Sequence, residues 1–169
     1  ITHDFYRPMS IHQLDGVIGA NGQLELMKAK MVSQSVTARA FPGFVKDGFD
    51  PFMVEGSNNV TYDIPNMEIT NVITDTGVRV GYWRSVSNAL NAFAIESFVD
   101  EAANAAGKDP VAFRMASLNK HPRAKAVLET AVKKSGYSAG SKKFGVAQME
   151  CYDTYSACVV ELDAASSDT

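Results

Sequence analysis

Long apolar runs and a strong excess of one charge are both missing from this 169-residue sequence. No stretch reaches the roughly 18 consecutive apolar residues that a membrane-spanning helix needs, so we expect no membrane span. Sixteen basic residues against 19 acidic ones give a formal net charge of −3, which argues against nucleic acid as a partner. The opening ITHDFYRPMS has no charged segment followed by an apolar one, so it does not resemble a signal peptide.

Histidine and cysteine are too few and too scattered to build a metal site. His3, His12 and His121 lie far apart, and there is no Cys-x-x-Cys pair, so we expect no metal ligands from this chain. Glycine-rich phosphate loops and a Gly-x-Ser-x-Gly elbow are also absent. Cys151 and Cys158 would face opposite sides of a continuous strand, so a disulfide would need a turn between them. We expect two buried structural thiols instead.

Residues 1–80 are predicted to be rich in β-structure. A hairpin over residues 9–36 turns at Ala20-Asn21-Gly22, because Asn-Gly is a strong hairpin signal. Residues 37–66 contain many aromatics, prolines and glycines with little periodicity, which indicates an ordered but irregular crossing. A further strand is expected at residues 67–74.

Residues 81–169 change to helical periodicity. Apolar residues repeat every four positions from Leu90 to Ala106, with Ser85 or Ser87 as the candidate N-cap. A short helix is predicted after Asp109-Pro110, and another from Pro122 to Gly136. Two strands, or one long bent strand, follow over residues 144–162. The fold class is therefore α+β, a hairpin and mixed sheet covered by about three helices, with residues 1–80 and 81–169 forming two units or one compact domain.

Charged side chains on these helices are expected to face solvent. Glu96, Asp100 and Glu101 fall close together on the first long helix, and nothing beside them suggests a raised pKa. The basic residues of the next two helices are interpreted in the same way; these are Arg114, Lys120, Arg123, Lys125, Lys133 and Lys134. A docking surface for an acidic partner is the less favoured alternative.

Trp83 and Arg84 stand between a strand end and the start of the long helix. A fixed positive charge beside the free N–H groups of a helix start suits an oxyanion or a phosphate. The plainer alternative pairs Arg84 with a nearby acid and uses Trp83 as a core anchor. From these residues alone, the plainer alternative is favoured.

The stretch GYWRSVSNALNAFAIESFVDEAANAAGKDPVAFRMASL, residues 81–118, resembles a known family. It is similar to the molybdenum-binding large subunit of the xanthine dehydrogenase and aldehyde oxidase family, in the branch typified by isoquinoline 1-oxidoreductase. HDFYRPMS, VKDGFDPFMVEG, YDIPN and KHPRAKAVLETAVKKSGY look like the same subunit, in the same order. The resemblance implies that this is a partial chain from its molybdopterin-binding domains.

The resemblance also implies a function and a set of site residues. The parent would hydroxylate an aldehyde or an N-heterocycle with water as the oxygen source, on a molybdopterin cofactor that often carries cytosine dinucleotide in such relatives. Arg84 would be the catalytic residue, with Trp83, Arg84 and Ser85 on the cofactor side. Val86, Gln148 and Met149 would line the substrate pocket. Its partners would be the rest of the large subunit and a small subunit with [2Fe–2S] clusters.

Departures from the family leave an alternative open. The upstream glycine-rich segments and the C-terminal glutamate base are not in these residues, and Ser87 stands where the branch usually has glycine. The chain alone is therefore not expected to be active or to hold the cofactor. It is either a fragment of the enzyme or a stand-alone, non-catalytic binding module, with self-association possible. Bacterial cytoplasm and periplasm both stay open.

Overall fold

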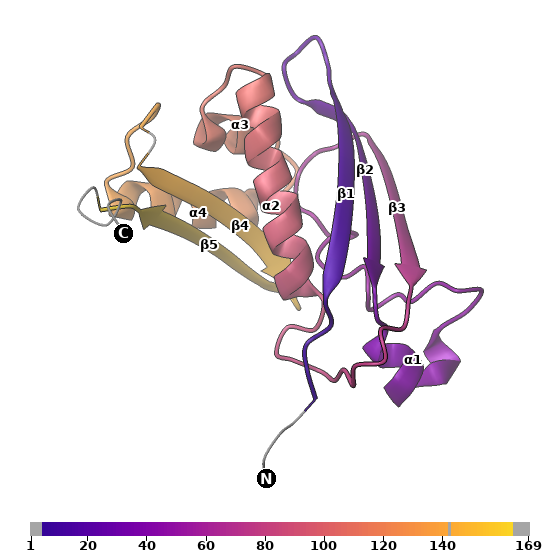
Figure 1. Cartoon of the computed structure of the whole chain (residues 1–169). Helices are drawn as coiled ribbons and strands as arrows, with labels where there is room; N and C mark the ends of the chain where they lie inside the picture. Colours follow the sequence, from indigo (N-terminus) through magenta and orange to yellow (C-terminus); the bar gives the residue numbers. More distant parts are fainter. Residues whose placement is uncertain (1–4, 142, 164–169) are drawn as a thin grey trace.

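The computed structural model describes residues 5–141 and 143–163, and confirms the α+β class. Five strands and four α-helices follow one another in the order shown in Figure 1. The strands are β1 (Ser10–Ile18), β2 (Leu24–Ser33), β3 (Asn66–Ile73), β4 (Phe144–Cys151) and β5 (Thr154–Glu161). The helices are α1 (Val36–Ala40), α2 (Asn88–Ala105), α3 (Pro110–Ala116) and α4 (Pro122–Ser135).

The predicted hairpin is confirmed as β1 and β2, which pair antiparallel. Its loop contains the expected turn, since Gly22 adopts a φ of +70° and the Asn21 side chain accepts a hydrogen bond from the Gln23 N–H at 2.9 Å. The predicted strand at residues 67–74 is β3, and it pairs in parallel with β2. The sheet is therefore mixed, in the order β1-β2-β3.

The crossing between β2 and β3 contains α1, a five-residue helix that the sequence pattern did not indicate. Ser35 caps this helix by accepting a hydrogen bond from the Ala38 N–H at 2.7 Å. The Ser35 hydroxyl also donates to the buried carboxylate of Asp50 at 2.6 Å, and Asp50 accepts the Phe52 N–H at 2.9 Å. A buried, fully bonded carboxylate thus fixes an irregular segment that has little regular backbone pairing.

The two C-terminal strands are separate strands of a second sheet, not one bent strand. They turn at Tyr152 and Asp153, whose φ angles of 51° and 62° match the left-handed conformation that tight hairpins require. Helix α4 packs against this hairpin, with Ala124 and Leu128 buried. In Figure 1 helix α2 runs between this hairpin and the three-stranded sheet.

The main core lies around α2. Ile95, Val99 and Ala103 of that helix are almost completely buried. From the first sheet they meet side chains such as Met27, and from the second they meet Val146. The core therefore draws on residues from both sides of position 80. No helix in the described ranges is long and apolar enough to cross a bilayer.

The solvated face predicted for α2 is wrong at Glu96, and the surface position predicted for Arg114 is also wrong. The Glu96 side chain is 8% exposed and that of Arg114 is 0% exposed. Arg114 Nε lies 3.1 Å from a Glu96 carboxylate oxygen, and its Nη1 lies 2.5 Å from Asp100. Since α2 is packed between two sheets, part of its polar side must be buried, and these charges are paired there. Glu101 is exposed, as predicted.

The two cysteines are not the buried pair that was expected. Cys151 is partly buried and Cys158 is exposed, and both are free thiols. Cys151 ends β4, and Cys158 lies in β5, where exposed and half-buried residues alternate and Cys158 is one of the exposed ones. The basic residues in and just before α4 do lie at or near the surface, as predicted; these are Lys120, Arg123, Lys125, Lys133 and Lys134.

Candidate functional site

The loop from Trp83 to Ser87 has an unusual backbone conformation. Ser85 and Val86 both have positive φ angles, +69° and +50°, although neither is glycine. The turn is closed by hydrogen bonds from the Val86 N–H to the Trp83 carbonyl and from the Asn88 N–H to the Ser85 carbonyl, each 2.9 Å. A β-branched residue in this region is strained, and such strain is concentrated at functional sites.

Neither serine caps α2 with its side chain. Ser87 occupies the N-cap position with a φ of −80° and makes no side-chain cap hydrogen bond, while the Ser85 hydroxyl donates to the carbonyl of Arg84. The predicted N-cap position is therefore confirmed at Ser87, but without the side-chain hydrogen bond that a serine cap usually makes. The φ of Ser87 also shows that this position needs no glycine, because the left-handed residues of the loop are the two before it.

Trp83 and Arg84 both face solvent. Trp83 is 61% exposed, so it is not the core anchor of the plainer alternative. Ion pairs in the described part of the chain involve Lys28 and Arg114 only, so Arg84 has no carboxylate partner there. The loop presents an unneutralised guanidinium and a large aromatic side chain in front of α2.

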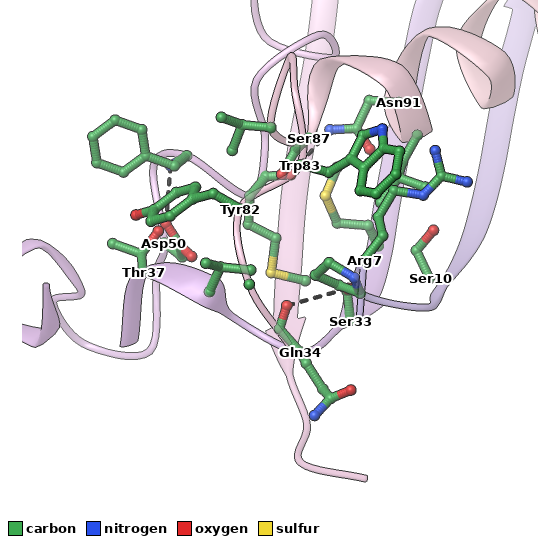
Figure 2. Close-up of a pocket in the computed structure, with 18 residues that line it drawn as sticks. Arg7, Ser10, Ser33, Gln34, Thr37, Asp50, Tyr82, Trp83, Ser87 and Asn91 are labelled. Atoms are coloured by element: carbon green, nitrogen blue, oxygen red, sulfur yellow. Dashed lines mark hydrogen bonds between the residues drawn. The ribbon is translucent and has the colours of Figure 1, made fainter. Parts of the chain in front are cut away.

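A small cavity with a mixed polar and apolar lining lies behind this loop. Its volume is about 30 Å³, which holds about one water molecule. Figure 2 shows Trp83 and Ser87 on this cavity together with Asn91 of α2 and the buried Asp50. Val86 also lines it, whereas Arg84 and Ser85 do not. The described residues therefore do not enclose a ligand larger than a water molecule at this loop.

Gln148 and Met149 lie elsewhere. They line a mainly apolar groove of about 570 Å³ between α2 and the β4–β5 hairpin, with Phe93 and Val160 among its other walls. The six predicted site residues thus fall into two places, the loop and the groove, which the described cavities do not join.

Buried polar groups hold Gln148 in place, and no sequence pattern pointed to them. The Gln148 N–H donates to Glu96 at 2.9 Å, and its side chain is hydrogen-bonded to Thr61. Tyr62 donates to the same carboxylate at 2.8 Å. Burial raises the pKa of Glu96 above its ordinary value, and burial together with the Glu96 charge raises the pKa of Tyr62. The contacts join residues up to 87 positions apart, beyond the reach of any local pattern.

The described residues offer charge and hydrogen-bond donors to a cofactor, but no cluster of metal ligands. Among the described residues there is no group of three or more His, Cys, Asp or Glu side chains that could hold a metal ion. The exposed guanidinium of Arg84 and the left-handed backbone at Ser85 and Val86 suit an anionic group lying against the loop. These residues fit a large anionic cofactor as one wall of its site.

Comparison with known proteins identifies relatives of this chain. No family model matches the chain. The chain is 31% identical over 134 residues to the beta subunit of isoquinoline 1-oxidoreductase from Brevundimonas diminuta, covering 76% of this chain and 17% of that protein. It is 44% identical over 63 residues to the B subunit of nicotinate dehydrogenase from Pseudomonas putida, covering 37% of this chain and 5% of that protein.

Two solved structures share the fold. The aldehyde oxidoreductase from Desulfovibrio gigas matches with a TM-score of 0.53 at 20% identity, over 85% of this chain and 18% of that one. The aldehyde oxidoreductase from Desulfovibrio desulfuricans matches with a TM-score of 0.57 at 15% identity, over the same shares of the two chains. Both show the fold alone, since sequence identity is low.

Sequence similarity therefore relates this α+β chain to the molybdenum hydroxylases. More particularly, it is a partial chain that is similar to the large subunit of that family, next to the isoquinoline 1-oxidoreductase branch. It spans less than a fifth of the length of these relatives.

Proposed function

We propose that this chain is the part of a molybdenum hydroxylase large subunit that supplies the Trp83–Val86 wall of the active site. The complete protein would hydroxylate an aldehyde or an N-heterocycle and take the oxygen from water. The single observation that carries this proposal is the solvent-facing Arg84 on a strained loop at the head of α2, in a chain whose sequence matches a molybdenum hydroxylase subunit.

Arg84 is proposed as the catalytic residue of this wall. A guanidinium keeps its charge at every physiological pH, and here no described carboxylate neutralises it. Such a charge stabilises negative charge that develops on a substrate oxygen or nitrogen, and a preorganised donor of this kind contributes about 10²–10³ in rate. The Ser85–Val86 turn holds the segment that carries this guanidinium.

Molybdopterin, in its cytosine dinucleotide form, is the proposed cofactor. It supplies the two-electron oxidation chemistry that amino acid side chains lack. Trp83, Arg84 and Ser85 would contact its anionic part through charge and hydrogen bonds, since the chain offers no metal ligands among its described residues. Val86 would contact the substrate.

Gln148 and Met149 are proposed as a second part of the substrate pocket. Gln148 is held rigidly by Glu96 and Thr61, as a residue that orients a ligand should be. Because the groove that they line is apolar, it would take the hydrocarbon part of an aromatic substrate. The rest of the large subunit and a small [2Fe–2S] subunit are the proposed partners, and they would close the site and carry electrons away.

The proposal is tested on the complete protein that contains this sequence. It is assayed with aldehydes and N-heterocycles in ¹⁸O-labelled water, for the native protein, Arg84→Gln and the control Arg123→Gln. We expect labelled product from the native protein, and a loss of kcat of about 10²–10³ in Arg84→Gln at unchanged molybdenum content. The control should keep its activity. Full activity in Arg84→Gln, or unlabelled product, contradicts the proposal.

A stand-alone binding module is the second candidate function. The core that joins residues on both sides of position 80 favours it, because such a core allows the chain to fold as one domain without its flanks. The test is the unfolding of the 169-residue chain alone. A single cooperative transition with the same midpoint by near- and far-UV circular dichroism supports this candidate. A chain that shows no unfolding transition excludes it.

A further inference from the structure

Two arginines lie against one aromatic ring at the end of the molecule where α1 meets the first described residues. Cζ of Arg39 is 4.3 Å from the centre of the Phe5 ring, and Cζ of Arg79 is 5.9 Å from the same point. Arg39 comes from α1, and Arg79 comes from the segment between β3 and α2. Two positive charges from different parts of the chain are therefore gathered around a single ring.

The backbone fixes this arrangement. The Tyr6 N–H donates to the carbonyl of Arg79 at 3.0 Å, and the Gly81 N–H donates to the carbonyl of Tyr6 at 2.9 Å. Gly81 also makes room for the ring, because a Cβ atom at this position would lie 2.5 Å from Cβ of Phe5. The position of Phe5 between the arginines thus depends on local pairing and on a glycine.

The arginines border a cavity of about 390 Å³, in the size range of small-molecule pockets. The side chains of Gln34 and Asp75 in its wall are already hydrogen-bonded. Gln34 donates to the Val78 carbonyl at 2.8 Å and to Asp75 at 3.3 Å. Asp75 accepts the Gly77 N–H at 2.8 Å through the same oxygen. The guanidinium groups are different, because within the described residues neither donates a hydrogen bond or pairs with a carboxylate.

Like charges that share a cavity repel one another, and an anion between them removes that repulsion. The Asp75 carboxylate in the same wall weakens the attraction for any anion, so binding depends on direct hydrogen bonds from the arginines. A phosphate group, with a charge of about −1.5 to −2 at neutral pH, still gains from two guanidinium forks, each of which matches its oxygens. The cavity also leaves space for what the phosphate is attached to.

We propose that the cavity between Arg39 and Arg79 binds the phosphate group of a phosphate ester or diphosphate. The site is separate from the Trp83–Val86 loop and does not depend on the function proposed for it. Its ligand is held by Arg39 and Arg79, while Phe5 keeps both side chains in place.

The test titrates the ¹⁵N-labelled 169-residue chain with inorganic phosphate and with pyrophosphate at constant ionic strength, and follows the amide NMR spectrum. We expect saturable shifts of the amides of residues 35–39 and 74–80. Arg39→Gln and Arg79→Gln should each weaken binding by about tenfold or more, since each removes charge-assisted hydrogen bonds. The matched control is Arg123→Gln, because Arg123 also lies on an aromatic ring, 4.4 Å from the centre of Tyr155, but outside the cavity.

A second measurement works on the complete protein and needs no assigned spectrum. Phenylglyoxal modifies accessible arginines, and mass spectrometry reports the modified positions. Pyrophosphate should protect Arg39 and Arg79 and leave the modification of Arg123 unchanged. Binding that does not saturate, equal affinity in Arg39→Gln/Arg79→Gln and the native chain, or equal protection of all three arginines would overturn the proposal.

Discussion

Removing the Arg114 guanidinium should destabilise the fold more than any other single charge removal described above. Arg114 is 0% exposed and contacts the carboxylate of Glu96, the carboxylate of Asp100 and the carbonyls of Glu96 and Pro110. Arg114→Met keeps most of the side-chain volume but leaves the Glu96 carboxylate buried without its cation. Loss of one partner of a buried pair costs about 3–5 kcal/mol.

That cost is large enough for a simple assay. Urea unfolding of the 169-residue chain gives the free energy of unfolding directly, and the thermal midpoint should fall by about 6–20 °C for a domain of this size. The control is Arg123→Met, an exposed arginine that contacts Tyr155, for which we expect a loss of less than about 1 kcal/mol. Adding Glu96→Gln to Arg114→Met should recover part of the loss, because it removes the uncompensated charge.

Two results would refute this reasoning about Arg114. One is a loss below about 1 kcal/mol in Arg114→Met, which would mean that water reaches Glu96 as easily as it reaches a surface carboxylate. The other is a double variant, Arg114→Met with Glu96→Gln, that is less stable than Arg114→Met alone by about 3–5 kcal/mol. Either would mean that α2 is not packed between the two sheets as described.

Three further changes test other parts of the fold by urea unfolding. Burial and a hydrogen bond to Asp109 raise the pKa of Tyr137 to about 12. The stability that this tyrosine confers is therefore complete below about pH 10 and is lost as the pH rises toward about 12. The Tyr137→Phe variant should lose less stability than the native chain over that pH interval. Val86→Gly should raise the free energy of unfolding by up to about 1 kcal/mol, because glycine accepts a φ of +50°. A decrease in the free energy of unfolding would show that the loop is unstrained. Gly56→Ala should cost more than about 1 kcal/mol, since φ is +88° and the new Cβ would lie 3.0 Å from Cα of Asn88; an unchanged midpoint would contradict the close packing there.

Elements with local chemical signals could be predicted from the sequence. Asn21-Gly22 located the hairpin, and Asp109 caps α3 as its spacing before Pro110 indicated, accepting the Ala112 N–H at 3.0 Å. The family resemblance could be detected in a short chain because it rests on several motifs in the same order, and the sequence match to isoquinoline 1-oxidoreductase confirms it. By contrast, α1 has only five residues and depends on Asp50, 15 positions beyond its cap.

The packing of α2 and the conformation of the loop before it could not be predicted. Amphipathic periodicity predicts that a helix has one solvent-exposed polar face. Helix α2 instead buries Glu96 as well as Ile95, because sheets lie on two sides of it. Its cation, Arg114, is 18 residues away on another helix, outside any i, i+4 pattern. Ser85 and Val86 adopt positive φ although neither residue type favours it, so only the folded chain reveals the turn.

We propose that this chain forms one wall of a molybdenum cofactor site, and that the rest of its subunit completes the site. The most direct measurement is the molybdenum and pterin content of the complete protein and of the 169-residue chain, each purified as a single size fraction. We expect close to one molybdenum per complete protein and none in the chain alone. A complete protein that is folded but contains no molybdenum, or a chain that binds molybdenum and pterin stoichiometrically by itself, would contradict the claim.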